Sequence, residues 1–453
     1  MKIIIVGAGK IGATLAELFA SEGHDVTIVD KNQKIVNNLV DKFDVMGVQG
    51  NGANSIVLKE AHADKADILI SVASTDEINM LTCTIAQKLG VKYTLARIRN
   101  PENTEQIGFI YKDLGIDMVV NPEFEAAEEI YRTIRFPSAL KLEKFAHGKV
   151  EIAEVIITEN HPLVGIRLCD LNSHSKVEIL ICAVKRGDDV IIPDGNFEIH
   201  ADDIIYIIAS HTELLLFFKE LDLLKRKIQY VMIIGGSKIA FYLSRMLLKQ
   251  GISVKIIEID RERCEELSVL LPKATIVNAD GSDGDVLTDE GIELVDACVT
   301  LTDMDEENII ISMFASSKKV SKVITKMTRM SLMSMMPQVK IENSVVSPKY
   351  LIANNIIRFV RSINNADGEN SIETLYKIVD SRVEAIEFKL KENFKAFGIP
   401  LKDLKIKPNI LIACIKRDTE VIRLNGTTTI EQGDRVIIVT TNDGLTNIND
   451  ILA

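Results

Sequence analysis

The sequence predicts an α/β protein built from two tandem copies of one unit. Each copy is expected to contain a doubly wound parallel sheet, then a long helix, then a small α+β subdomain. Short apolar runs rich in β-branched residues alternate with helical patterns in the first part of each half, which implies a parallel sheet covered by helices. The motifs of the first half recur in the second half, and a glycine-rich loop joins the first apolar run to the first helix.

Composition and charge narrow the class of protein. The 453 residues carry 53 Lys+Arg against 65 Asp+Glu, a formal net charge of −12, which argues against a general nucleic-acid binder. Apolar residues make up 47%, enough for large cores. No apolar run is long enough to span a membrane, so we expect no membrane-spanning segment. The six cysteines form no C-x-x-C pair and are expected to be reduced thiols in a cytoplasmic protein without a metal site.

The repeat extends over the whole chain. The stretch MKIIIVGAGKIGATLAELFASEGHDVTIVD from Met1 matches YVMIIGGSKIAFYLSRMLLKQGISVKIIEID from Tyr230. In the last part of each half, ILICAVKRGDDVIIPDG (residues 179–195) matches ILIACIKRDTEVIRLNG (residues 410–426). Two copies of one unit therefore account for the chain without a further domain.

The repeat and the element pattern set the expected boundaries. In the first copy, Asn121 is a plausible N-cap and Pro122 suits the first position of the long helix. The expected segments are a parallel-sheet domain (1–121), a crossover helix and linker (122–146) and an α+β subdomain (147–225), followed by a second, degenerate parallel-sheet domain (228–347), a second crossover helix and linker (348–374) and a second α+β subdomain (375–453).

The first copy carries a phosphate-binding loop of the Rossmann type. The run Gly7-Ala8-Gly9-Lys10-Ile11-Gly12 is a G-x-G-x-x-G between a strand and a helix. The first glycine allows the tight turn, the second lets the backbone approach a pyrophosphate, and the third lets the helix pack closely. The helix N-terminus adds unpaired N–H groups and positive potential. Lys10 is a further candidate for contact with phosphate.

Other candidate ligand-binding residues follow the later strands. Asp30 ends the second strand, where a carboxylate binds ribose hydroxyls and disfavours a 2′-phosphate. This residue favours NAD(H) or an adenine nucleotide over NADP. The remaining candidates lie at the carboxyl edge of the expected sheet, where open α/β folds bind ligands: Asn51, Gly52, Ala73, Ser74 and Arg97.

The second copy of the loop is degraded. It begins with Gly235, but Ser237 replaces the glycine whose missing side chain admits a pyrophosphate. Lys238 and Glu258 are retained as candidate binding residues, and Lys326 stands where the first copy has Arg97. This copy is expected to bind a nucleotide weakly, to bind a different one, or to serve as scaffold.

These motifs together resemble a known family. The order GAGKIG, VTIVD, GNGAN, ADILISVASTDEINML, ARIRNPE and VVNPE is similar to the regulator of K⁺ conductance (RCK, or KTN) domain, and the following subdomain resembles the RCK C-terminal subdomain. Two such units in tandem, over nearly the whole chain, resemble TrkA-type regulatory subunits of Trk potassium-uptake systems.

The resemblance implies a function as well as a fold. It implies a cytoplasmic, non-enzymatic protein on the inner face of the cell membrane. This protein would gate a K⁺-translocating subunit of the TrkH/TrkG type through a homo-oligomeric (dimeric or tetrameric) ring of RCK domains. Its ligand would be NAD(H) or ATP/ADP, bound by the loop and strand-end residues named above. The resemblance also implies that Glu123 lies near the phosphates or a cation, although a helix-start glutamate is an equally good interpretation.

Two other functions stay open on the residues alone. An NAD-dependent oxidoreductase would share the loop, but no Y-x-x-x-K motif and no histidine in a recognisable catalytic setting occur in the sequence. A structural ring protein with vestigial nucleotide pockets would also agree with the sequence, because the second loop has lost a glycine of the phosphate-binding motif. Turnover of NADH would indicate the first, and absence of nucleotide binding the second.

Overall fold

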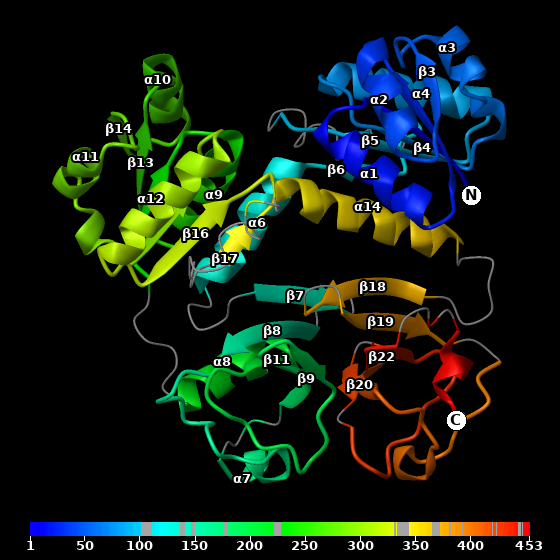
Figure 1. The fold of residues 1–453 in the computed structure, drawn as a ribbon, viewed down its shortest axis with the longest axis vertical. Helices are drawn as coiled ribbons and strands as arrows, with labels where there is room; N and C mark the ends of the chain where they lie inside the picture. The colour runs from blue at the N-terminus through cyan, green and yellow to red at the C-terminus, as the bar shows by residue number, and fades with distance from the viewer. Residues whose placement is uncertain are drawn as a thin grey trace.

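The fold consists of two parallel-sheet domains and two antiparallel subdomains, with two long helices between them (Figure 1). The computed structural model describes residues 1–100, 111, 113–135, 141–145, 150–174, 177, 179–221, 228–329, 332, 344–364, 372–379, 382–390, 393–418, 420–422, 424–442, 445 and 447–453. The predicted linkers that join each long helix to its subdomain lie in part outside these residues.

The two parallel sheets have the same topology. The first has the order β3-β2-β1-β4-β5-β6 and the second the order β14-β13-β12-β15-β16-β17. The strands of the first are β1 (Lys2–Val6), β2 (Asp25–Asp30), β3 (Met46–Gln49), β4 (Ile68–Ser71), β5 (Tyr93–Arg97) and β6 (Met118–Val120). Those of the second are β12 (Tyr230–Ile234), β13 (Ser253–Glu258), β14 (Thr275–Asn278), β15 (Ala297–Thr300), β16 (Lys322–Lys326) and β17 (Ser344–Val346). The predicted fold class and the tandem repeat are confirmed.

Helices cover both faces of each sheet, so the central strands are buried on both sides. Ile3, Ile4 and Ile5 of β1, for example, are all buried, which explains why the strand reads as a continuous apolar run. The first-unit helices are α1 (Lys10–Ser21), α2 (Gln33–Lys42), α3 (Ser55–Glu60) and α4 (Asp76–Leu89). The second-unit helices are α9 (Lys238–Lys249), α10 (Arg261–Leu270), α11 (Gly284–Asp289) and α12 (Asp305–Ser317).

The long helices exchange partners between the units. α6 (Pro122–Arg135) follows the first sheet but buries Ala127, Ile130 and other apolar residues in the core of the second sheet, against α9. α14 (Pro348–Asn364) follows the second sheet but buries Ile352 and Ile356 in the core of the first, against α1. Figure 1 shows α14 beneath the first domain and α6 running towards the second. The exchange ties the two units together through their hydrophobic cores.

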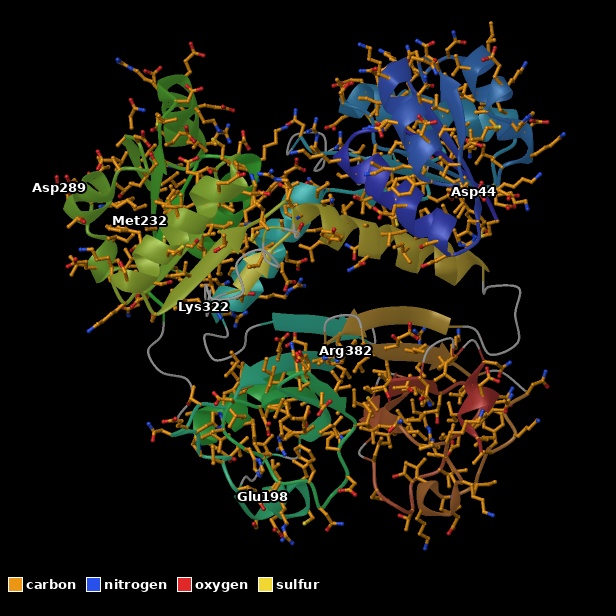
Figure 2. All side chains as sticks on the ribbon, viewed as in Figure 1. Asp44, Glu198, Met232, Asp289, Lys322 and Arg382 are labelled. Carbon is orange, nitrogen blue, oxygen red and sulfur yellow. The ribbon has the colours of Figure 1, made fainter. Side chains whose placement is uncertain are left out.

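The two antiparallel subdomains also pack together. The first has the order β10-β9-β11-β8-β7 and the second β18-β19-β22-β20-β21. One core contains Cys182 and Tyr206 of the first subdomain with Ala385 and Cys414 of the second, and Arg382 donates a hydrogen bond to the Asp188 carbonyl across the contact (Figure 2).

The two antiparallel subdomains contain matching sets of strands. The first subdomain comprises β7 (Lys141–Phe145), β8 (Val150–Ile156), α7 (Leu171–His174), β9 (Leu180–Arg186), β10 (Asp189–Ile191), β11 (Ile204–Ala209) and α8 (His211–Glu220). The second comprises β18 (Ile372–Ile378), β19 (Val383–Lys389), β20 (Ile410–Arg417), β21 (Glu420–Ile422) and β22 (Arg435–Thr440).

A buried histidine in the first subdomain makes stability depend on pH. His161 accepts a hydrogen bond from the Leu163 amide, and its Nε2 atom is buried without a partner among the described residues. Burial lowers the pKa of His161 to about 4. The unfolded chain therefore takes up a proton near pH 6.5, before the folded protein does. We expect the free energy of unfolding to fall by about 2 kcal/mol between about pH 6.5 and pH 4 because of this residue.

The second unit suggests the control variant. Phe394 occupies the position that matches His161 and is likewise buried. His161→Phe should keep the packing and flatten the pH dependence of the melting temperature between pH 6.5 and 4. An unchanged pH profile in this variant would mean that other groups cause the loss of stability in acid.

Candidate functional site

The glycine loop between β1 and α1 has three glycines with different surroundings. Gly7 adopts φ +101°, and a Cβ there would lie 2.8 Å from the Ala73 nitrogen. At Gly12 a Cβ would lie 1.9 Å from the Gly7 carbonyl oxygen. At Gly9 a Cβ would meet nothing within 4 Å. Gly7 and Gly12 are therefore required by the fold, whereas Gly9 leaves open space beside the backbone.

The N-terminus of α1 is left open by this loop. Gly9 is the N-cap of α1 and makes no side-chain capping bond. By contrast α2, α3 and α4 are capped by Asn32, Asn54 and Thr75. Since no side chain of the N-cap occupies the first N–H groups of α1, they can bind an external acceptor, and the helix dipole favours an anionic one.

Asp30 lies at the end of β2 beside the loop. One carboxylate oxygen accepts the Ala8 amide at 2.7 Å, and the other accepts the Asn32 amide at 2.9 Å. Carboxylate oxygens have further lone pairs, so both can still accept hydroxyl groups from a ligand. Asp30 thus supports the loop and presents acceptors next to it.

A half-buried arginine and a half-buried glutamate flank the loop on the other side. Arg97 ends β5 and donates to the Ala73 carbonyl, and its Nε atom is buried without a partner among the described residues. Burial, aided by the nearby Arg99 charge, lowers the pKa of Arg97 to about 10. Glu123, in the first turn of α6, has a carboxylate oxygen Oε2 with no partner among the described residues. Burial raises the pKa of Glu123, and the nearby cations Arg99, Arg97 and Lys238 oppose that rise.

A buried asparagine holds this side of the site together. Asn79 of α4 accepts the Ala73 amide at 2.7 Å and donates to the Arg97 carbonyl at 2.8 Å. In the second unit Asn308 makes the same contacts with Thr302 and with the Lys326 carbonyl. This role of Asn79 was not among the predictions made from the sequence. The available signal was an asparagine at the same place in both repeats, Asn79 in the first and Asn308 in the second.

A cavity of about 690 Å³ lies over the loop, and both units line it. From the first unit it is lined by Gly7, Gly9, Lys10, Ile11, Asp30, Asn51, Gly52, Ala73, Ser74, Arg97, Glu123 and their neighbours. From the second unit it is lined by Ser237, Lys238, Ile239, Asp303, Lys326, Thr328, Pro348 and Lys349. The exchange of α6 and α14 brings the two units face to face, which makes a shared cavity possible.

The structure brings together most of the predicted ligand-binding residues, but not all of them. Ala8 and Gly12 lie behind the loop, where they contact Asp30 and Gly7 rather than the cavity. Gly235 and Glu258 of the second unit also lie outside the lining, whereas Lys238 belongs to it.

The cavity is cationic although the chain is acidic. Among the described residues, six cationic side chains line it: Lys10, Lys31, Arg97, Lys238, Lys326 and Lys349. Three acids face them, Asp30, Glu123 and Asp303, of which Asp303 is paired with Lys326 at 3.5 Å. Against a net charge of −12 for the chain, this local excess of positive charge favours a ligand with several negative charges.

The glycine loop of the second unit is covered by its own side chains. The Ser237 hydroxyl accepts the Ala240 amide and so caps α9. Arg263 donates to the Gly236 carbonyl at 2.6 Å, at the position where the first unit has the cavity-lining Ile35. The second loop therefore lacks the open helix end and the open space of the first.

The described residues contain neither a cluster of metal ligands nor a membrane-spanning helix. Among the described residues, no group of three or more His, Cys, Asp or Glu side chains is placed to hold a metal ion. In the same part of the chain, no helix is both long and apolar enough to cross a membrane.

Comparison with protein families agrees with the architecture. The TrkA-N domain matches residues 3–122 and 231–348, and the TrkA-C domain matches residues 152–222 and 385–453. The fold and its shared cavity define a protein with tandem RCK domains, each a Rossmann-type domain followed by a C-terminal subdomain.

Full-length relatives place the chain within that class. The Trk system potassium uptake protein TrkA of Vibrio alginolyticus is 33% identical over 446 residues, covering 98% of this chain and 96% of its own length. TrkA homolog 1 of Methanosarcina mazei is 31% identical, covering 97% of both chains. The chain belongs to the TrkA family of Trk system potassium uptake proteins.

Solved structures show the same fold at lower identity. The GsuK RCK domain aligns with a TM-score of 0.65 at 16% identity, covering 98% of this chain and 92% of its own. A GsuK channel bound to NAD aligns with a TM-score of 0.64 at 16% identity, covering 98% of this chain and 77% of its own.

Proposed function

We propose that this protein is a regulatory subunit that binds one anionic nucleotide between its two units and thereby controls K⁺ flow through a membrane translocator. The observation that carries the proposal is the cavity of about 690 Å³ over the open N-terminus of α1, with its excess of cationic side chains. Family membership supports the link to potassium uptake.

The ligand is NAD(H) or ATP/ADP. In this proposal the loop Gly7–Gly12 and the N-terminus of α1 bind the phosphates, and Asp30 binds the ribose next to the loop. Asn51, Ser74 and Arg97 line the rest of the pocket. The GsuK structures with NAD and with ADP make both ligand classes reasonable for a related fold.

The second unit takes part in binding at the same cavity. Lys238, Lys326 and Lys349 line the cavity from α9, β16 and α14 of the second unit. A ligand that contacts both sides holds the two units at one distance, so its binding selects one arrangement of the units. This is the step by which nucleotide binding would change the shape of a larger ring.

The partners and the location follow from this role. The protein would act in the cytoplasm, at the inner face of the cell membrane, on a translocating subunit of the TrkH/TrkG type. It would do so as a homo-oligomeric ring, dimeric or tetrameric, and without catalysing a reaction.

Potassium uptake measured with the purified partner tests the function. Proteoliposomes containing the translocator should take up K⁺ at a rate that changes when this protein is added, and changes again with ATP, ADP, NAD⁺ or NADH. Equal uptake under all these conditions would contradict the proposal. Steady consumption of NADH with added ketones would instead indicate an oxidoreductase.

A further inference from the structure

A tyrosine of the second unit contacts two segments of the first unit that carry residues of the shared cavity. Tyr242 of α9 is buried, and its hydroxyl accepts a hydrogen bond from Asn121 Nδ2 at 3.0 Å and donates one to the Arg99 carbonyl at 3.3 Å. Its ring meets the Phe124 ring edge to face, with centroids 5.4 Å apart and planes at 86°. One side chain thus joins α9 to two separate segments of the first unit.

Both segments carry cavity residues. Asn121 is followed directly by Pro122 and Glu123, which line the cavity, and its Oδ1 accepts the Phe124 amide at the start of α6. Arg99 lies two residues after the cavity-lining Arg97, and its guanidinium donates to the Ser74 carbonyl. Tyr242 itself is not among the residues that line the cavity.

The positions that match Tyr242 and Asn121 in the other repeat make no such hydrogen bonds among the described residues. Thr14 of α1 matches Tyr242, and its hydroxyl donates to the Lys10 carbonyl of its own helix. Ser347 matches Asn121, and its buried hydroxyl has no partner among the described residues. Thr14 instead lines a second cavity of about 540 Å³, together with residues of the second unit such as Met304 and Arg329. Among the described residues, the connection therefore exists beside the first loop and not beside the second.

We infer that Tyr242 is a positioning residue that couples occupancy of the first-unit cavity to α9 of the second unit. A ligand that contacts Arg97 and Glu123 restrains the segments on which they lie. The Tyr242 hydroxyl bonds pass that restraint to α9, which itself packs along α6. The inference rests on the proposed nucleotide binding, because coupling requires a ligand whose affinity differs between two arrangements of the units.

Amide hydrogen exchange tests the coupling, with ATP or NADH as the probe. We compare the wild type, Tyr242→Phe and the control Tyr230→Phe, which removes a hydroxyl from an exposed tyrosine of β12. In the wild type and the control, saturating nucleotide should slow exchange both in residues 118–135 and in α9. In Tyr242→Phe, nucleotide should still slow exchange in residues 118–135. The slowing of exchange in α9 should fall about fivefold, as expected for the loss of a buried hydrogen bond.

Calorimetric titration of the same samples distinguishes a failure of the proposed coupling from a failure of the proposed nucleotide binding. Tyr242→Phe should bind nucleotide within about threefold of the wild type, because the hydroxyl lies outside the cavity. Equal slowing of exchange in α9 of Tyr242→Phe and the wild type would overturn the coupling. So would nucleotide binding to the wild type without any slowing in α9, although the proposed function would then stand. A wild type that binds neither ATP nor NADH would overturn both.

Discussion

Gly9→Trp is expected to lower nucleotide affinity at least about 100-fold, which is about 3 kcal/mol of binding free energy, while the protein stays folded. Gly9 adopts φ −68°, which any residue tolerates, and a Cβ there meets nothing within 4 Å. The indole ring would therefore enter the cavity at the N-terminus of α1, where the phosphates are expected to bind. Fluorescence titration with NADH and calorimetric titration with ATP measure the loss.

The controls separate this effect from unfolding. Glu265→Trp places the same ring on the exposed surface of α10 and should bind nucleotide as the wild type does. The melting temperature of Gly9→Trp without ligand should match that of the wild type. Binding by Gly9→Trp with unchanged affinity would show that the ligand does not approach this loop.

Replacing the three second-unit lysines of the cavity is expected to lower ATP affinity about 100-fold. Lys238, Lys326 and Lys349 each place a positive charge at the cavity from an element of the second unit. A charge near a phosphate in a partly buried site contributes on the order of 1 kcal/mol, and less for Lys326 because Asp303 already pairs with it. The triple variant to Gln should show this loss in calorimetric titration, and single variants should show smaller losses.

A matched variant tests whether position or net charge matters. Lys59→Gln, Lys65→Gln and Lys88→Gln together make the same change in net charge on exposed surface of the first unit, and this triple variant should keep the wild-type affinity. The cavity variant should also lose more affinity for ATP than for ADP, since fewer phosphates reach the second unit. Equal affinity of the cavity variant and the wild type would mean that the first unit binds the ligand alone.

The local parts of the site were predictable from the sequence. Gly7, Gly9 and Asp30 lie within one strand-helix-strand segment, so their spacing alone predicts that they converge at one edge of a sheet. The repeat likewise predicts two sheets of one topology. The start of α6 was predictable because Asn121 and Pro122 carry short-range signals for a helix N-terminus.

The contacts between the units were not predictable in the same way. Lys349 and Tyr242 reach the first-unit site only because α6 and α14 exchange partners, and such an exchange depends on packing between segments far apart in the chain. From the sequence, Tyr242 is a buried position of an amphipathic helix and Lys349 a polar residue near a helix start. The degraded second loop suggested a weak or lost site, whereas its Lys238 faces the cavity of the first unit.

The number of nucleotides bound per chain tests the central claim most directly. Calorimetric titration of the full-length protein with ATP and with NADH yields this stoichiometry as well as the affinity. One shared cavity, with the second loop covered by Ser237 and Arg263, predicts one nucleotide per chain. Two equivalent nucleotides per chain would contradict the shared cavity, and no binding of either ligand would contradict regulation by nucleotide altogether.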